Sequence, residues 1–305
     1  MDKRLLLGSL IALVSASSFA MNVTLSRMAY DAGTNIHALN VSRTLFFLIC
    51  LVLWLRMTGQ PMGLPSRARL ASLGLGLLLC VEMYSLLGVI IFMPVGLVIV
   101  VMFCYPLMIA AWSWIRGVEQ PTVVALIAML AAFAGIVLAL GGTADALDWR
   151  GVALGFCAAL GMVGLLLVGA RVMAAHDNRV VMLHMTVMAG AVMIVLSVTL
   201  TDLAWPQGAV GWFAFVGSCL LYVAATICLF TALNMIGPLR TAIIDNSSPI
   251  WAVFFSYLLL GEVLTVTQTI GAALVVAALI VLQLAQRRRT RSLPSGAAAA
   301  VDGQG

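Results

Sequence analysis

Residues 244–262, IDNSSPIWAVFFSYLLLGE, decide the fold because a related stretch precedes them in the same chain. That earlier stretch, residues 103–119, reads FCYPLMIAAWSWIRGVE. Both contain a proline inside an apolar run and a glutamate 13 residues later, and the two pairs are 143 residues apart. The pairs are Pro106 with Glu119 and Pro249 with Glu262. Repetition at a fixed spacing indicates a duplicated structural unit.

The chain around these stretches is apolar. Of its 305 residues, 63% are hydrophobic and 9% are charged, and the mean hydropathy is +1.14. Soluble domains carry about 25% charged residues, so this chain cannot cover a water-facing globule. A helix needs about 20 apolar residues to cross a membrane. Ten such runs lie near residues 5–25, 37–57, 69–91, 95–115, 122–141, 151–170, 181–200, 211–235, 239–260 and 264–284.

These runs are continuously apolar, which favours helices over the alternating strands of a membrane barrel. The predicted fold class is therefore an all-α integral membrane protein with ten transmembrane helices. Gly8 aligns with Gly151 at the same 143-residue spacing, so the duplication covers both halves. Five helices per half is an odd number, which predicts a 5+5 inverted-topology repeat. We expect the halves to be residues 1–142 and 148–286, followed by a basic and then disordered tail at 287–305.

The positions of Lys and Arg predict that both termini are cytoplasmic. In that orientation the outer side receives only Arg27, Arg43 and Arg150 of the 16 Lys and Arg residues. The formal net charge of +5 largely reflects this bias. We therefore expect the basic tail to contact anionic lipid headgroups of the bilayer, and we expect no nucleic-acid partner.

The paired stretches resemble the signature of the drug/metabolite transporter superfamily and, more narrowly, of its ten-helix EamA-type family. The second copy is the closer match, with ALNMIGPLRTAII before Asp245 and with Gln268 and Gly271 after it. The first copy lacks the LGE ending and carries Pro121 shortly after its glutamate. The resemblance covers about residues 5–285. It implies a central cavity lined by helices one to four and six to nine, with helices five and ten as outer supports, and a location in a bacterial inner membrane.

Four ionisable residues inside predicted spans are functional candidates, because a charge there costs from about 3 kcal/mol upward. Arg43 and Glu82 either form a buried ion pair or leave Glu82 poised to bind and release a proton. Asp245 is either a coupling group or an interfacial carboxylate held by Arg240 or by water. His184 is a proton relay or a tolerated interfacial residue. The proton-coupling candidates are Glu82, Asp245 and His184.

Polar and aromatic side chains at helical spacing predict which faces line a substrate cavity. Small hydroxyl residues also serve close helix packing, and aromatic residues also face lipid, so structural roles are the alternative. The substrate-cavity candidates are Ser15, Ser18, Asn22, Arg43, Glu82, Tyr84, Tyr105, Tyr222, Asp245, Ser248 and Trp251.

Pro106 and Pro249 are predicted helix-kink positions, because a proline inside a helix removes a backbone hydrogen bond. The kinks either shape the cavity and move during gating or are static. We expect Glu119 and Glu262 to be structural, each capping the amino terminus of a following helix. The six cysteines are expected to be free thiols buried within spans.

The sequence contains no HExxH, GxSxG or phosphate-loop motif, so we expect no enzyme activity, cofactor or metal. The predicted function is secondary active transport of small metabolites or amphipathic compounds. We expect export by alternating access, with proton coupling as a further hypothesis and the monomer as the functional unit. The alternatives are an uncoupled facilitator of the same fold and, less favoured, a membrane-embedded enzyme or scaffold subunit.

Overall fold

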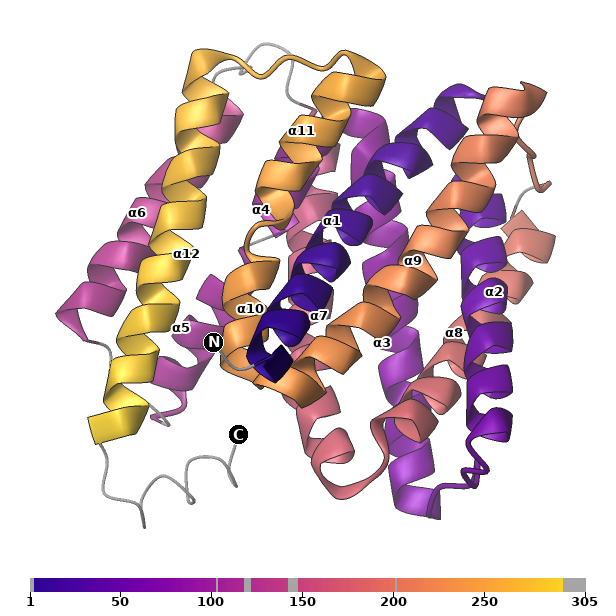
Figure 1. Cartoon of the computed structure of the whole chain (residues 1–305). Coiled ribbons are helices and arrows are strands. Elements are labelled where there is room, and N and C mark those ends of the chain that lie inside the picture. Colours follow the sequence, from indigo (N-terminus) through magenta and orange to yellow (C-terminus); the bar gives the residue numbers. More distant parts are fainter. Residues whose placement is uncertain (1–2, 103, 118–121, 142–147, 201, 293–305) are drawn as a thin grey trace. The chain divides into compact units, whose positions relative to one another are not determined.

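The computed structural model describes residues 3–102, 104–117, 122–141, 148–200 and 202–292, and all regular structure in these ranges is helical. The helices follow one another along the chain in a single series (Figure 1). They are α1 (Lys3–Asp31), α2 (Ile36–Met57), α3 (Ser66–Phe92), α4 (Val95–Met102), α5 (Tyr105–Ile115), α6 (Val123–Gly141), α7 (Trp149–Ala175), α8 (Asn178–Leu200), α9 (Gly208–Ile236), α10 (Pro238–Asp245), α11 (Ser248–Leu260) and α12 (Val266–Ser292).

Eight helical segments of the described chain are long and apolar enough to cross a membrane. Two of these segments contain a break: Val95–Ile115 joins α4 to α5, and Ile243–Leu260 joins the end of α10 to α11. Shorter apolar stretches lie in α6 and α12. The prediction of an all-α, multi-pass membrane protein is confirmed. The described part of the predicted tail continues α12 as far as Ser292, and residues 293–305 lie outside the described ranges.

The two halves of the sequence contain the same series of helices. α4 and α10 begin 143 residues apart, at Val95 and Pro238, and α5 and α11 also begin 143 residues apart. Each half therefore has a helix break at the equivalent position. The breaks directly precede Pro106 and Pro249, each of which occupies the second position of a new helix.

Cys104 and Ser247, which lie directly before the two helix starts, keep a right-handed helical conformation, so the kinks at Pro106 and Pro249 stay a prediction. A proline near a helix start costs little, since its missing N–H would have no helical partner there. The same residue in mid-helix would remove a bond and crowd the preceding turn. The break therefore places each proline where the helix tolerates it.

The chain forms two compact units that do not coincide with its sequence halves. The first unit comprises Met1–Met21, Met93–Trp149 and Ala224–Gly305. The second comprises Asn22–Phe92 and Arg150–Val223. Each unit thus combines helices from both halves of the sequence.

In the first unit, α6 packs closely on α12 through small residues (Figure 1). A Cβ atom built on Gly135 would lie 2.9 Å from the Val275 side chain, and one built on Gly271 would lie 2.5 Å from the Ala139 nitrogen. Gly135 precedes Ala139 in α6, whereas Val275 follows Gly271 in α12. The two helices, which occupy equivalent places in the two halves, therefore run antiparallel.

In the second unit, the equivalent helices α2 and α8 also run antiparallel. The Thr44 hydroxyl donates to the Met193 sulfur at 3.3 Å, and the Arg179 guanidinium donates to the Thr58 hydroxyl at 3.5 Å. Thr44 lies within α2 and Thr58 directly follows its last residue, whereas Met193 follows Arg179 in α8. Two separate pairs of equivalent helices thus run antiparallel.

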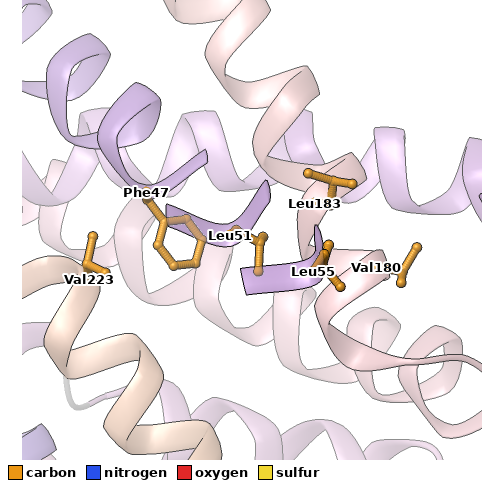
Figure 2. Close-up of a cluster of buried hydrophobic side chains, with 6 residues drawn as sticks. All are labelled: Phe47, Leu51, Leu55, Val180, Leu183 and Val223. Carbon is orange, nitrogen blue, oxygen red and sulfur yellow. The ribbon is translucent and has the colours of Figure 1, made fainter. Parts of the chain in front are cut away.

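Apolar side chains fill the contact between α2 and α8, and α9 adds one more. Burial of such side chains contributes roughly 1.5–3 kcal/mol each relative to exposure in water. Between membrane helices the gain comes mainly from close packing. Figure 2 shows this cluster, which consists of Phe47, Leu51, Leu55, Val180, Leu183 and Val223.

Candidate functional site

The second unit contains a cluster of buried polar side chains centred on Arg43 of α2. Arg43 is 1% exposed, and its guanidinium carbon lies 4.9 Å from the centre of the Tyr222 ring of α9. Its charge acts on Tyr30 and Tyr222 and on the Glu82 carboxyl group. We call Tyr30, Arg43, Glu82 and Tyr222 the arginine cluster.

Hydrogen-bond donors in this cluster are left unused. The Arg43 Nε atom and the Tyr30 hydroxyl are buried and have no hydrogen-bond partner among the described residues. Asn40, one helical turn before Arg43, is fully buried and its side-chain amide is also unpartnered there. An unsatisfied buried polar group costs about 1–3 kcal/mol. Several together indicate a place that receives water or a bound solute.

Glu82 of α3 is 5% exposed and lies beside α7. It influences Arg43 electrostatically, but within the described part of the chain no ion pair joins the two side chains. A direct Arg43–Glu82 ion pair, one of the two alternatives for these residues, is therefore absent from the described chain. A Cβ atom built on Gly161 would lie 2.9 Å from the Glu82 Cβ atom. Gly161 thus allows α7 to approach the backbone that carries Glu82.

Replacing Gly161 with alanine is expected to destabilise the protein, because the added methyl group would press on Glu82. Overpacking of this kind costs about 1–3 kcal/mol. Gly169 lies in the same helix, and no atom lies within 4 Å of the position that its Cβ would occupy. Gly169→Ala should therefore be neutral or stabilising by up to about 1 kcal/mol from helix propensity. Reversible unfolding of the two purified variants measures the difference, and equal effects would contradict the packing described for Glu82.

Tyr84 of α3 belongs to a hydrogen-bonded group in the same unit. Its hydroxyl lies 3.0 Å from Nδ1 of His37. The sequence prediction missed His37 and Asn40. Both could have been found, because His37, Asn40 and Thr44 recur at intervals of three and four and therefore share one face of α2.

His184, also in the second unit, makes a local contact. Its Nδ1 atom lies 2.9 Å from the Val180 carbonyl oxygen, one turn earlier in α8. A histidine engaged with its own helix has less freedom to relay a proton along a chain of partners. The proton-relay role of His184 stays a prediction.

In the first unit, the break between α10 and α11 brings polar groups together. Asp245 ends α10, and the following two residues, Asn246 and Ser247, each have a buried side-chain atom that finds no hydrogen-bond partner among the described residues. Tyr105, at the start of α5, lies within electrostatic range of Asp245. The described residues include no ion pair between Asp245 and Arg240, so the alternative in which Arg240 holds this carboxylate is not observed there.

Two serine hydroxyls of the first unit join separate helices. Ser15 of α1 donates to the Ala225 carbonyl at 2.8 Å, and Ser248 donates to the Ala16 carbonyl at 3.4 Å. These contacts favour the packing alternative for both serines. Trp251 stacks on Phe255 within α11, with ring centres 5.8 Å apart.

The predicted site residues are thus divided between the two units. The second unit holds Asn22, Arg43, Glu82, Tyr84, Tyr222 and His184. The first unit holds Ser15, Ser18, Tyr105, Asp245, Ser248 and Trp251, together with Pro106 and Pro249.

Glu262 follows α11 and caps another helix. Its Oε2 atom accepts a hydrogen bond of 3.0 Å from the Val95 N–H, at the amino terminus of α4. The sequence predicted a cap on the following helix, but that helix, α12, is capped locally by Thr265 and Gln268. The cap differs from the predicted one because folding brings the Glu262 carboxylate to the amino terminus of α4, which is distant in the sequence. Glu119 lies outside the described residues.

Glu262→Gln is expected to lower the free energy of unfolding by about 1 kcal/mol. The amide can still accept the bond from Val95, but it loses the charge that favours a helix amino terminus. Glu262→Ala should cost more, about 1–2 kcal/mol, because the bond itself is lost. Reversible unfolding of the purified protein tests this order, and an alanine variant as stable as the wild type would refute the cap.

The described part of the chain offers no group of three or more His, Cys, Asp or Glu side chains that could hold a metal ion. All six cysteines are free, and Cys157 is exposed whereas Cys80, Cys104 and Cys219 are buried. The expectation that every cysteine is buried was therefore wrong for Cys157.

Comparison with known proteins agrees with the repeat. The model of the EamA-like transporter family matches residues 6–141 and again residues 149–284. No curated protein matches the chain. One solved crystal structure aligns with 92% of this chain and 98% of its own, at a TM-score of 0.67 and 17% sequence identity, which shows a shared fold alone. Because the two family matches together cover most of the sequence, the chain belongs to the EamA-like transporter family.

Proposed function

We propose that this membrane protein is a secondary active transporter that exports small metabolites or amphipathic compounds by alternating access. The observation that carries the proposal is the pair of helix breaks at equivalent positions, between α4 and α5 and between α10 and α11. Interrupted helices in both halves of a repeat are typical of transporters, because the breaks expose backbone and side-chain polar groups to a bound solute.

We further propose ten spans in a 5+5 inverted-topology repeat, with domains at 1–142 and 148–286. Eight long apolar segments and two shorter ones, in α6 and α12, account for the ten proposed spans. The antiparallel course of α6 with α12 and of α2 with α8 supports the inversion. Inverted halves can exchange conformations and so open a central site to either side of the membrane.

The arginine cluster and the Asp245 region supply the polar groups for this activity. Glu82 and Asp245 are the proposed proton-coupling residues, because each is an ionisable side chain in a membrane helix. We place the protein in a bacterial inner membrane, with both termini in the cytoplasm and the monomer as the transporting unit. An uncoupled facilitator of the same fold is the alternative, in which the carboxylates only stabilise helix contacts.

An untargeted comparison of metabolites in spent medium tests export. Cells that overproduce the wild type are compared with cells that contain equal amounts of a membrane-inserted Glu82→Gln, Asp245→Asn variant. We expect one class of compound to accumulate outside only with the wild type. Import is indicated instead if that class is depleted from the medium. Matching profiles would contradict export that depends on these two carboxylates.

A further inference from the structure

Arg43 has the features of a binding group for an anion. The side chain is 1% exposed, its guanidinium lies over the Tyr222 ring, and its Nε atom has no hydrogen-bond partner among the described residues. A cation over an aromatic face gains about 2 kcal/mol when desolvated. Removing an ion from water costs several kcal/mol. The Tyr222 contact alone does not offset this cost, and the Glu82 carboxyl group acts on Arg43 without an ion pair among the described residues.

Two neighbours of Arg43 also have side chains that can form hydrogen bonds with a bound anion. The Tyr30 hydroxyl and the Asn40 amide are hydrogen-bonding groups that are buried and unpartnered within the described residues. Tyr30 lies within electrostatic range of Arg43, and Asn40 is one turn away on the same helix. A ligand that accepts hydrogen bonds would satisfy the guanidinium, and the Asn40 amide lies one turn away from it on the same helix.

The charge and the donor geometry of the arginine cluster favour one class of anion over others. A guanidinium presents paired N–H donors that fit the two oxygens of a carboxylate. Arg43 supplies a single positive charge, and Glu82 lies close enough to oppose additional negative charge. A dianion such as a phosphate ester is therefore a poorer fit than a single carboxylate. The Phe47 ring packs edge-on to Tyr222, with centres 5.7 Å apart, and gives the site an apolar wall.

We propose that the arginine cluster is the subsite that binds a carboxylate group of the transported solute. The Arg43 guanidinium binds the carboxylate, and the Tyr222 ring packs against the guanidinium. The inference rests on the proposed function, since it names the class of solute. Such a subsite makes the protein selective for amphipathic monocarboxylates over neutral analogues of the same shape.

Ligand-induced stabilisation of the purified full-length protein in lipid nanodiscs tests this inference. The probes are sodium benzoate and sodium hexanoate, each paired with its neutral amide and with sodium chloride at equal ionic strength. We expect at least one carboxylate to raise the unfolding temperature in a saturable manner, and we expect its amide and chloride not to do so. Equal effects of carboxylates and amides, or no effect of either carboxylate, would overturn the proposal.

Variants assign the effect to Arg43. Arg43→Gln should weaken carboxylate binding at least about tenfold, because charge-assisted hydrogen bonds are lost. The matched control is Arg56→Gln, an exposed arginine at the other end of α2, which should bind as the wild type does. If Arg43→Gln does not fold, Arg43→Lys keeps the charge but loses the paired donors, and it should also bind more weakly.

Retained affinity in a folded Arg43 variant, or equal loss in Arg56→Gln, would overturn the assignment. The assay needs no gradient and no transport. A chain that exports some other solute but shows no preference for carboxylates would therefore refute this inference and leave the proposed function standing.

Discussion

Replacing Gly271 with leucine is expected to lower the free energy of unfolding by about 3 kcal/mol, an overpacking cost at the upper end of the usual range. A Cβ atom at this position would lie 2.5 Å from the Gly135 carbonyl oxygen and 2.5 Å from the Ala139 nitrogen. Both are backbone atoms of α6, so no side-chain movement can relieve the clash. Leucine would have to push α6 away from α12.

The control for this variant is Gly74→Leu in α3. Gly74 is exposed, and no atom lies within 4 Å of the position that its Cβ would occupy. A leucine there should be tolerated by the folded protein. Reversible unfolding of both purified variants measures the difference. Equal stability of Gly271→Leu and Gly74→Leu would show that the close α6–α12 contact does not contribute to folding.

Neutralising the two membrane carboxylates is expected to abolish solute accumulation against a gradient. In vesicles with a one-unit pH difference, each proton exchanged supplies about 1.4 kcal/mol, which corresponds to about tenfold accumulation. The Glu82→Gln, Asp245→Asn variant should reach a ratio of about one, because neither amide can carry the proton. The measurement is the steady-state ratio of the exported compound inside and outside proteoliposomes.

Asp202→Asn is the matched control, since Asp202 is an exposed carboxylate between α8 and α9. It should accumulate solute as the wild type does, and the single variants then separate Glu82 from Asp245. A wild type that equilibrates the solute without concentrating it would identify a facilitator. Full accumulation by the double variant would eliminate both carboxylates as coupling groups.

Much of the fold could be predicted from the sequence, because membrane helices are recognisable by their length and apolarity. The predicted run at 37–57 corresponds to α2 at Ile36–Met57, and the run at 69–91 lies within α3 at Ser66–Phe92. The 143-residue repeat was also visible, since its proline and glutamate recur without a gap. The helix breaks were not, because a proline is compatible with both a kink and a new helix start.

The site was predictable in its residues and not in its contacts. Arg43 and Glu82 were identified because charges are rare in apolar runs, and both are buried. No ion pair joins them in the described chain, and a sequence pattern does not specify side-chain contacts between separate helices. The cap that Glu262 makes on Val95 joins residues 167 positions apart in the sequence, so no local pattern could reveal it.

The most direct test of the central claim is transport by the purified protein alone. Proteoliposomes would be loaded with a cytosolic small-molecule extract, and the compounds that leave would be identified over time. Protein-free vesicles and vesicles with the Glu82→Gln, Asp245→Asn variant serve as references. A transporter predicts that a limited chemical class leaves faster from wild-type vesicles, with a rate that saturates as its concentration rises. Identical loss of every compound from all three preparations would contradict the claim that this chain is a transporter.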